Sequence, residues 1–372
     1  MSDNVKLSEV CEILNSNVDK KTKENEQKVK LCNFIDVYNN WAITKYTSKK
    51  FMTATATQNE INKFSLKKGY VAITKDSETK DDIGISTYIA DNFDNVLLGY
   101  HCTLLKPNQK VLNGKFLNAY LSSFYGRKYF SNCASGSGQR YTLTIDVIND
   151  LTIPLINIET QQKIARTLSI LDQKIENNHK INELLHTLAY KIYKYYFKYK
   201  PKNAKLEQII IENPKSSIMV KNAQKTQDKY PFFTSGDNIL SYPKAIIDGR
   251  NCFLNTGGNA GIKFYVGKAS YSTDTWCICA NEFSDYLYLL LSSIKTHINQ
   301  SFFQGTSLKH LQKNLLKKYP IYMPSVHEIK KFNQIIMPLL TLISINTRTS
   351  KKLEQIRDFL LPLLLKQQVK PQ

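Results

Sequence analysis

Polar and basic side chains gather in two loops of the N-terminal half of the chain. One loop follows the strand-like run Gly69–Thr74 (GYVAIT), and the other is Ser135–Leu143 (SGSGQRYTL). Guanidinium, amide and hydroxyl groups can hydrogen-bond to the edges of nucleic-acid bases, while lysines and backbone amides suit phosphates. The candidate contact residues in these loops are Thr74, Lys75, Ser77, Lys80, Gln139, Arg140 and Tyr141. A solvated charged turn and a hairpin with an exposed arginine are the alternative interpretations.

The C-terminal half contains two loops of the same kinds. Asn255–Gly261 (NTGGNAG) is glycine-rich but lacks the glycine spacing of a dinucleotide-binding loop, so we expect a close backbone approach to a ligand there and favour a DNA phosphate over a cofactor. Gln304–Leu311 (QGTSLKHL) resembles the loop Ser135–Leu143, and Leu143 and Leu311 are 168 residues apart. The candidate contact residues are Arg250, Asn255, Asn259, Lys263, Thr306, Ser307 and Lys309. Because single polar residues are common in surface loops, the main prediction is the pair of loops in each half.

The residue spacings that catalysis or metal binding would need are missing from the sequence. The seven cysteines include no Cys-x-x-Cys pair, and His327-Glu328 lacks the second histidine of a metalloprotease helix. The one Asn-Pro step, Asn213-Pro214, does not form an amino-methylation loop, and there is no Walker A loop. We therefore predict reduced core cysteines and a chain without catalytic residues, metal ligands or a cofactor of its own.

The net charge of the chain favours a polyanionic partner. Lys and Arg number 51 and Asp and Glu number 31, which gives +20 at pH 7. A charge of this size concentrates polyanions around a protein, so nucleic acid is the first partner to consider. The codon bias of an AT-rich genome is the alternative explanation. No run approaches the ~20 apolar residues that span a bilayer, and the first ten residues contain no apolar signal, so we expect a cytoplasmic protein without membrane contact.

Two long amphipathic helices must position these loops. Ile153–Phe197 and Ile321–Leu365 share one apolar pattern at a constant offset of 168 residues, with heptad spacing inside each copy. The positions expected to face the partner helix are Ile164, Leu168, Leu171, Ile175, Asn178, Leu185 and Ile192 in the first copy, and Phe332, Ile336, Leu339, Ile343, Asn346, Leu353 and Leu360 in the second. If the copies pair antiparallel, Asn178 and Asn346 meet within about one turn and form a polar layer that fixes the register.

The second helix departs from a regular heptad pattern at three residues. Pro338 lies inside the heptad run and should kink or split the helix, and Pro362 should bend or end its last turns. Arg357 occupies an inward position, so we expect the neighbouring Ile356 to turn inward beside it. Ahead of this helix, Ser325 and Glu328 have the spacing of a capping box, which predicts where the helix begins.

The tyrosine-rich run Tyr190–Tyr199 (YKIYKYYFKY) closes the first helix. Its rings could stack on bases, as aromatic side chains do in single-strand binders. Because the aromatic residues have helical spacing, we expect core packing or contact with a partner protein instead.

A mainly β globular domain precedes each long helix. Gly69–Thr74, Asn95–Tyr100 and Cys252–Leu254 have the composition of buried strands, and Phe116–Phe124 and Asp285–Ile294 that of short helices in corresponding places. The predicted divisions are a first globular domain (1–152), a first helical spacer with a linker (153–205), a second globular domain (206–320) and a second helical spacer (321–372). The predicted fold class is α+β, with an internal pseudo-two-fold repeat and two long helices that pair as an antiparallel coiled coil.

In this order of elements the chain resembles the specificity subunit of type I restriction-modification systems. Leu151–Leu168 (LTIPLINIETQQKIARTL) and Tyr319–Phe332 (YPIYMPSVHEIKKF), each with the helix behind it, are similar to the two conserved regions of that family. Leu31–Tyr38 (LCNFIDVY) and Gly69–Ser86 (GYVAITKDSETKDDIGIS) are similar to its target recognition domains. The resemblance covers essentially the whole chain. Ile156–Ile158 (INI) stands where the family commonly has a proline-rich turn, which leaves the start of the first helix open.

The resemblance implies a non-catalytic reader of double-stranded DNA. Each target recognition domain would read one half of a split site, and the paired helices would set the spacing of the halves. It further implies two modification subunits, which bind S-adenosylmethionine and methylate adenine N6, and restriction subunits that use ATP and Mg²⁺ to translocate and cleave. Two other functions stay open from the residues alone: a helical adaptor without sequence-specific DNA binding, and a nuclease with an unrecognised site.

Overall fold

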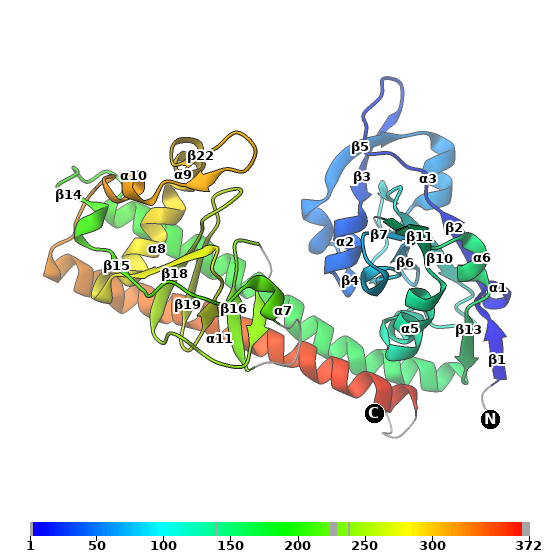
Figure 1. Ribbon diagram of the computed structural model, residues 1–372. Helices are drawn as coiled ribbons and strands as arrows, with labels where there is room; N and C mark the ends of the chain where they lie inside the picture. Colours follow the sequence, from blue (N-terminus) through cyan, green and yellow to red (C-terminus); the bar gives the residue numbers. More distant parts are fainter. Residues whose placement is uncertain (1–2, 138–139, 224–228, 237–238, 367–372) are drawn as a thin grey trace. The chain divides into compact units, whose positions relative to one another are not determined.

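The chain forms two compact units (Figure 1). The computed structural model describes residues 3–137, 140–223, 229–236 and 239–366. Unit 1 comprises Met1–Gln173 and Ile356–Gln372, and unit 2 comprises Lys174–Gln355. The two long helices α7 (Ile158–Phe197) and α11 (Val326–Leu365), each of 40 residues, contribute one segment to each unit. Within the described ranges, no helix has the length and apolar content needed to cross a membrane.

The globular part of unit 1 is built on a five-stranded sheet. Its strands, in spatial order, are β2 (Cys11–Asn15), β10 (Cys102–Pro107), β6 (Val71–Thr74), β8 (Ser86–Ile89) and β4 (Ala42–Ile43). Successive residues of a strand point to opposite faces. In β6, Val71 and Ile73 pack with Phe116, while Ala72 packs with Leu104 in a separate cluster. The continuous apolar run GYVAIT therefore reflects a strand that is buried on both faces.

The remaining elements of unit 1 surround this sheet. A three-stranded sheet consists of β5 (Met52–Ala56), β3 (Gln27–Cys32) and β9 (Val96–Leu98). The short helices are α1 (Leu7–Val10), α2 (Phe34–Asn39), α3 (Gln58–Phe64), α4 (Gly114–Ser122), α5 (Phe124–Cys133) and α6 (Ile145–Asn149). Strand β1 (Asp3–Lys6) pairs with β13 (Thr152–Leu155), the strand that leads into α7.

The globular part of unit 2 has a four-stranded sheet. Its strands, in spatial order, are β15 (Ile211–Glu212), β21 (Thr275–Cys279), β18 (Arg250–Asn255) and β19 (Ile262–Val266). A three-stranded sheet consists of β17 (Leu240–Tyr242), β16 (Tyr230–Phe233) and β20 (Ser270–Tyr271). The helices are α8 (Ser284–Ser293), α9 (Lys295–Ser301) and α10 (Lys313–Lys317). Strand β14 (Ala204–Lys205) pairs with β24 (Pro320–Ile321), which precedes α11.

The two units repeat one topology. The strand order β2-β10-β6-β8 corresponds to β15-β21-β18-β19, and β5-β3-β9 corresponds to β17-β16-β20. Each three-stranded sheet contains one parallel pair, β3 with β9 in unit 1 and β16 with β20 in unit 2. In both units the first strand pairs with the strand that leads into a long helix. The predicted α+β fold with an internal repeat is confirmed.

Side-chain hydrogen bonds show the direction of the long helices in unit 2. Nδ2 of Asn178 donates to Oγ of Ser350 (3.1 Å), and Nδ2 of Asn346 donates to Oδ1 of Asn182 (2.9 Å). From the first pair to the second, the residue number rises by four in α7 and falls by four in α11. The predicted antiparallel pairing is therefore confirmed. Asn178 and Asn346 belong to one polar layer, but they do not bond to each other. The partner of Asn178 lies one turn from Asn346, and the partner of Asn346 lies one turn from Asn178.

Apolar contacts surround this polar layer. Of the predicted pairing positions, Ile164, Leu168, Ile175, Asn178, Phe332, Ile336 and Ile343 are buried, and Leu171, Leu185, Ile192, Leu339, Asn346, Leu353 and Leu360 are partly buried. The tyrosine-rich run supplies core residues, since Tyr193 and Phe197 are buried with Phe332. Tyr195 and Tyr199 are exposed.

The phase of the second helix differs from the heptad prediction near Leu339 and again near Leu360, where Leu361 is the buried residue. Leu340 is 1% exposed, whereas its neighbour Leu339 is only partly buried. The buried residues Phe332, Ile336, Leu340 and Ile343 follow a period near 3.6, because this segment packs on the globular part of unit 2 as well as on α7. Helix α11 also continues through Pro338 without a break, so the helix is not split there.

The expectation that Ile356 turns inward is wrong. Ile356 is 37% exposed, whereas the side chain of Arg357 is 13% exposed. The guanidinium of Arg357 faces inward because Oδ1 of Asp172 lies 3.6 Å away and the ring centroid of Trp41 lies 4.3 Å away. An arginine can occupy an inward helix position when a carboxylate and an aromatic face receive it.

The start of α7 does not need a proline-rich turn. Oδ1 of Asn157 accepts a hydrogen bond from the backbone amide of Thr160 (2.8 Å), which caps the helix. The fully buried Gln161 donates from Nε2 to the carbonyls of Ile156 (2.7 Å) and Val111 (2.9 Å). At the start of α11, Ser325 and Glu328 form the predicted capping box.

Candidate nucleic-acid interface

In unit 1 one small sheet joins the two predicted contact loops. Strands β11 (Ser135–Ser137) and β12 (Arg140–Thr142) form a hairpin. Strand β12 also pairs with β7 (Asp76–Ser77), which belongs to the loop after GYVAIT. The backbone amide of Leu143 donates to the carbonyl of Lys75 (2.8 Å) and extends this junction. Two loops that are far apart in sequence therefore form one platform, which we call platform 1.

Asp76 holds platform 1 together. Its carboxylate accepts from Oγ1 of Thr142 (2.9 Å) and lies 2.8 Å from Nδ1 of His101 and 3.3 Å from a guanidinium nitrogen of Arg140. Burial raises the pKa of Asp76, but the contacts with His101, Thr142 and Arg140 outweigh it, so the pKa lies below the usual value of 3.8. The charged carboxylate tethers Arg140, whose side chain is still 59% exposed.

The other predicted residues of unit 1 fall into three groups. Lys80 is exposed, while Lys75, Ser77 and Tyr141 are partly exposed. Nζ of Lys80 lies 5.5 Å from the ring centroid of Tyr141. Thr74 is fully buried, and its hydroxyl accepts from the backbone amide of Ile85 (3.0 Å) within the domain. Gln139 lies outside the described residues.

Unit 2 joins its two predicted loops in the same way. Strands β22 (Phe303–Gln304) and β23 (His310–Leu311) form a hairpin, coloured orange in Figure 1. The backbone amide of Gly258 donates to the carbonyl of Lys309 (2.9 Å), and that of Leu311 donates to the carbonyl of Thr256 (3.0 Å). The glycine-rich loop and the hairpin thus form platform 2. Gly258 has a φ of +76°, a conformation that favours glycine.

Some side chains of platform 2 are exposed, and others form hydrogen bonds within the domain. The exposed predicted residues are Asn259, Thr306, Ser307 and Lys309. Asn255 is 6% exposed and donates from Nδ2 to the carbonyl of Asn259 (3.1 Å), which closes the glycine-rich loop. Nζ of Lys263 donates to the carbonyl of Thr234 (2.8 Å) and to Oδ1 of Asn255 (3.2 Å). Asn255 and Lys263 therefore shape the loop from inside.

Arg250 lies in the interior of unit 2 and does not reach platform 2. Its Nε donates to Oδ2 of Asp285, and a second nitrogen pairs with the other carboxylate oxygen. A third nitrogen donates to Oγ1 of Thr341 in α11 (2.9 Å). The Arg250 side chain is 17% exposed and that of Asp285 is 2% exposed, so a DNA contact by Arg250 would have to break a buried ion pair.

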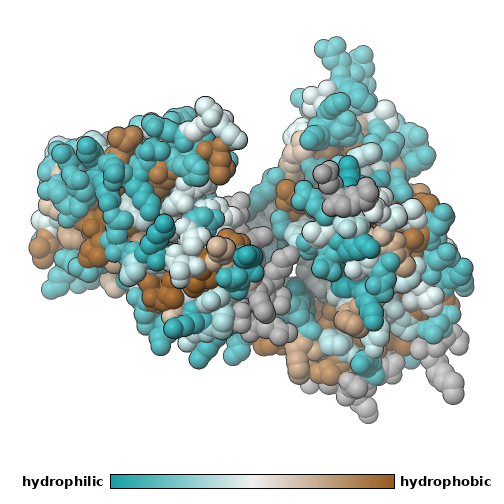
Figure 2. Space-filling view, in the orientation of Figure 1, coloured by the Kyte–Doolittle hydropathy of each residue, from teal (hydrophilic) through white to brown (hydrophobic). Residues whose placement is uncertain are grey.

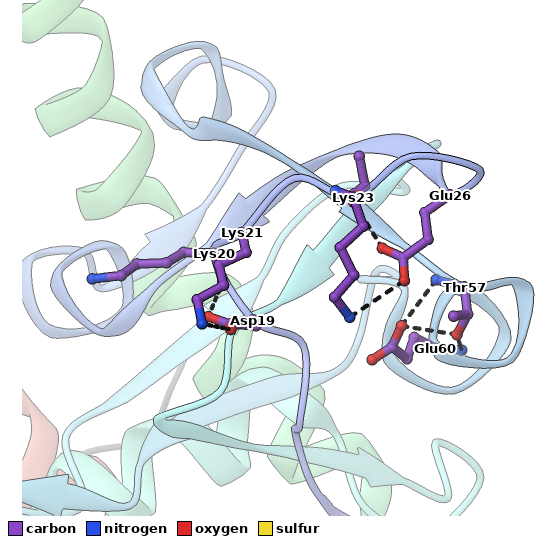
Figure 3. A network of polar contacts seen from close by, with 8 residues as sticks. Asp19, Lys20, Lys21, Lys23, Glu26, Thr57 and Glu60 are labelled. Carbon is purple, nitrogen blue, oxygen red and sulfur yellow. Dashed lines mark hydrogen bonds and ion pairs between the residues drawn. The ribbon is translucent and has the colours of Figure 1, made fainter.

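The sequence reasoning missed a charged loop between β2 and β3, which contains three lysines and three acids. Figure 3 shows Lys20, Lys21 and Lys23 in this loop, and Figure 2 shows the hydrophilic surface at its tip, at the top of the view. Lys21 pairs with Asp19 (3.8 Å) and Lys23 with Glu26 (3.4 Å), while Lys20 points away from both carboxylates. Because acidic residues flank these lysines, a count of net charge along the sequence does not single out this loop.

Groups suited to metal or thiol chemistry are not assembled in the described part of the chain. It contains no cluster of three or more His, Cys, Asp or Glu side chains that could hold a metal ion. All seven cysteines are free, and Cys11, Cys32, Cys102, Cys252 and Cys277 are buried. Burial raises the pKa of Cys11 to about 12, which disfavours a reactive thiolate there.

Known proteins are similar to this chain in sequence and in fold. A family model described as "Type I restriction modification DNA specificity domain" matches residues 2–187 and 202–355. The chain is 31% identical over 136 residues to the type I restriction enzyme HindI specificity subunit of Haemophilus influenzae, and the match covers 36% of this chain and 29% of that protein. It is 24% identical over 341 residues to the MjaIX specificity subunit of Methanocaldococcus jannaschii, with 80% and 74% covered. The crystal structure of a type I restriction-modification S subunit from M. genitalium has a similar fold, with a TM-score of 0.56 at 16% identity and 98% and 96% covered.

Proposed function

Because the chain belongs to the type I restriction-modification DNA specificity family, we propose that it reads a split sequence in double-stranded DNA, one half with each globular domain. The duplicated platform carries this proposal. Each unit joins a polar loop to a hairpin through backbone pairing, although the loops are distant in sequence. Two equivalent reading surfaces in one chain suit a target with two specified halves. The net charge of +20 supplies the attraction to phosphates.

The proposed contact residues are those whose side chains leave the platforms. They are Lys75, Ser77, Lys80, Arg140 and Tyr141 on platform 1, and Asn259, Thr306, Ser307 and Lys309 on platform 2. Arg140 and Asn259 have the donors that read base edges, while lysines and hydroxyls suit phosphates. Thr74, Arg250, Asn255 and Lys263 are left out, because their polar groups bond within the domains. Gln139 stays a prediction from the sequence.

The long helices offer surfaces for partner subunits. On α7, Ile181, Leu184 and Leu188 are 43%, 70% and 46% exposed, and their spacing places them on one face of the helix. On α11, Ile335, Leu342 and Ile345 are between 41% and 42% exposed. Exposed apolar stripes of this kind suit packing against helices of another protein. We propose that two modification subunits dock on these helices, because each helix carries one such stripe, and that restriction subunits join that complex.

The chemistry is proposed to belong to the partners. This chain would bind and place the DNA, while the modification subunits hold S-adenosylmethionine and methylate adenine, and the restriction subunits use ATP and Mg²⁺. In this proposal the chain itself needs no cofactor. We propose that the complex acts in the cytoplasm, where it would meet its DNA target.

The test uses the full chain in complex with its cognate modification subunit. Methylated adenines are mapped on a DNA library, first for the natural chain and then for a chain whose residues 206–320 are replaced by the matching domain of a relative. We expect one half of the methylated site to change and the other half to stay. Methylation that ignores the replacement would contradict the proposal and favour the adaptor.

Two point variants separate base readout from phosphate contact. Lys309→Ala should weaken binding to all sequences and lower the slope of log affinity against log salt by about one. Arg140→Ala should relax the preference at one base pair, with a cost of roughly 1–3 kcal/mol if it makes a bidentate base contact. Lys6→Ala is the control, because Lys6 is an exposed lysine on β1 that pairs with Asp150. Equal effects of all three variants would mean that the platforms do not contact DNA.

A further inference from the structure

Buried charges connect the globular part of unit 1 to both long helices. Nζ of Lys115, in α4, lies 3.1 Å from Oδ2 of Asp172 in α7 and donates to Oγ of Ser169 (2.7 Å). Arg357 of α11 approaches the other oxygen of Asp172 at 3.6 Å and packs on Trp41. The Lys115, Asp172 and Arg357 side chains are only 11–13% exposed. We call Lys115, Asp172 and Arg357 the first seat.

The carboxylate of Asp172 is the centre of the first seat. In the described part of the chain its two buried oxygens accept no hydrogen bond, so the ion pairs with Lys115 and Arg357 compensate its charge. A buried charge without its partners is strongly disfavoured. An arrangement of the globular part, α7 and α11 that brings both cations to Asp172 is therefore favoured in unit 1 over one that leaves its charge unpaired.

Unit 2 has a corresponding contact, in which an acid occupies the place of the lysine at the start of the short helix. Asp285 is the second residue of α8, as Lys115 is the second residue of α4. Its charge is paired by Arg250 of β18, which also donates to Oγ1 of Thr341 (2.9 Å) and to the carbonyl of Met337 (3.3 Å) in α11. We call Arg250, Asp285 and Thr341 the second seat.

The repeat places both seats at the same point of the long helices. The offset of 168 residues carries Asp172 of α7 to Leu340 of α11, directly beside Thr341. At this point α7 presents an acid to a lysine, and α11 presents neutral acceptors to an arginine that an acid already holds. At the equivalent point of the other helix, Lys115 would find no carboxylate, whereas Arg250 would face the carboxylate of Asp172. The contact with the long helix therefore differs in chemistry between the two globular domains, and only α7 offers Lys115 a carboxylate at this point.

We propose that the two seats are positioning elements that fix how each globular domain sits on its own long helices and thereby set the length of the unspecified spacer in the target. This inference rests on the proposed function. Buried ion pairs contribute orientation more than net stability, since both partners lose their hydration and the opposite charge compensates that loss only in one geometry. Lys115, Asp172, Asp285 and Arg250 would act through the platforms and would not touch DNA.

The test compares spacer lengths in the complex with the modification subunit. Methylation rates are measured on DNA with the natural spacer and with spacers one base pair shorter and longer. Lys115→Met and Asp172→Asn should lower the ratio of natural to altered spacer about tenfold, and Asp172→Glu should restore most of it. Lys6→Met, which breaks the exposed pair with Asp150, is the matched control and should leave the ratio unchanged.

The outcomes separate positioning from support of the fold. A uniform loss of rate on all spacers, or an unchanged ratio, would overturn the inference. If the natural complex methylates no defined site, the proposed function has failed, and hydrogen exchange of the free full-length chain decides the seat. There Lys115→Met should speed exchange in α4 and in residues 165–173 while Lys6→Met does not, and equal exchange in both variants would overturn it.

Discussion

Inserting seven residues into each long helix should lengthen the spacer of the target. The two units divide α7 after Gln173 and α11 after Gln355. Asn178 faces Ser350, and extending that antiparallel register by about one turn brings the two divisions opposite each other. Insertions at these two points therefore keep the heptad pattern and leave the contacts inside each unit unchanged.

The size of the effect follows from helix geometry. Seven residues add about 10.5 Å at ~1.5 Å per residue, which corresponds to about three base pairs at ~3.4 Å each. The insertion turns the helix by only about 20° from its former phase, whereas three base pairs turn the DNA by roughly 105°. We therefore expect a spacer that is about three base pairs longer, together with slower methylation than the natural complex shows on its own site.

The assay is adenine methylation by the complex on a DNA series in which only the spacer length varies. An insertion of the same seven residues into the connection 198–203, after α7 has ended, is the control and should leave the preferred spacer unchanged. An insertion into α7 alone should abolish specific methylation, because the polar layer can no longer pair. A double insertion that keeps the natural spacer would refute the idea that the helices set the distance.

Three further predictions concern the helices themselves. Replacing Asn182 and Asn346 together by Leu should raise the thermal unfolding midpoint, because a partly buried amide pair specifies register at a cost in stability, while either single replacement should lower it. A lower midpoint for the double variant would contradict this. Hydrogen bonds from the Ser325 backbone and then from the Tyr322 hydroxyl lower the pKa of Glu328 from 4.5 to about 2, so its contribution to stability is complete above about pH 4.5 and is lost as the pH falls towards 2. Urea midpoints of Glu328→Gln and the natural chain should therefore differ at pH 7 and converge near pH 2. Leu340→Ala should cost about 2–5 kcal/mol in unfolding free energy and Leu339→Ala clearly less, since Leu340 is the buried residue. Equal losses in the two variants would support the predicted heptad position at Leu339 instead.

The sequence by itself determined the features that depend on local periodicity. The heptad pattern repeats every few residues, so it predicted both long helices, their polar layer and the duplication of the chain without knowledge of distant contacts. The capping box at Ser325 and Glu328 was readable for the same reason, because its two partners are three residues apart. Loops rich in glycine and polar residues were predicted in pairs, and the structure joins each pair into a platform.

Only the tertiary structure decided which polar residues face outward. Thr74, Asn255, Lys263 and Arg250 have the composition of contact residues, but their partners come from segments between 4 and 91 residues away and take them into the interior. A charge can be buried only where an opposite charge meets it, and that meeting place is a property of the folded chain. Arg357 shows this most clearly, because Asp172 and Trp41 draw it inward at a position where the local pattern favours its apolar neighbour.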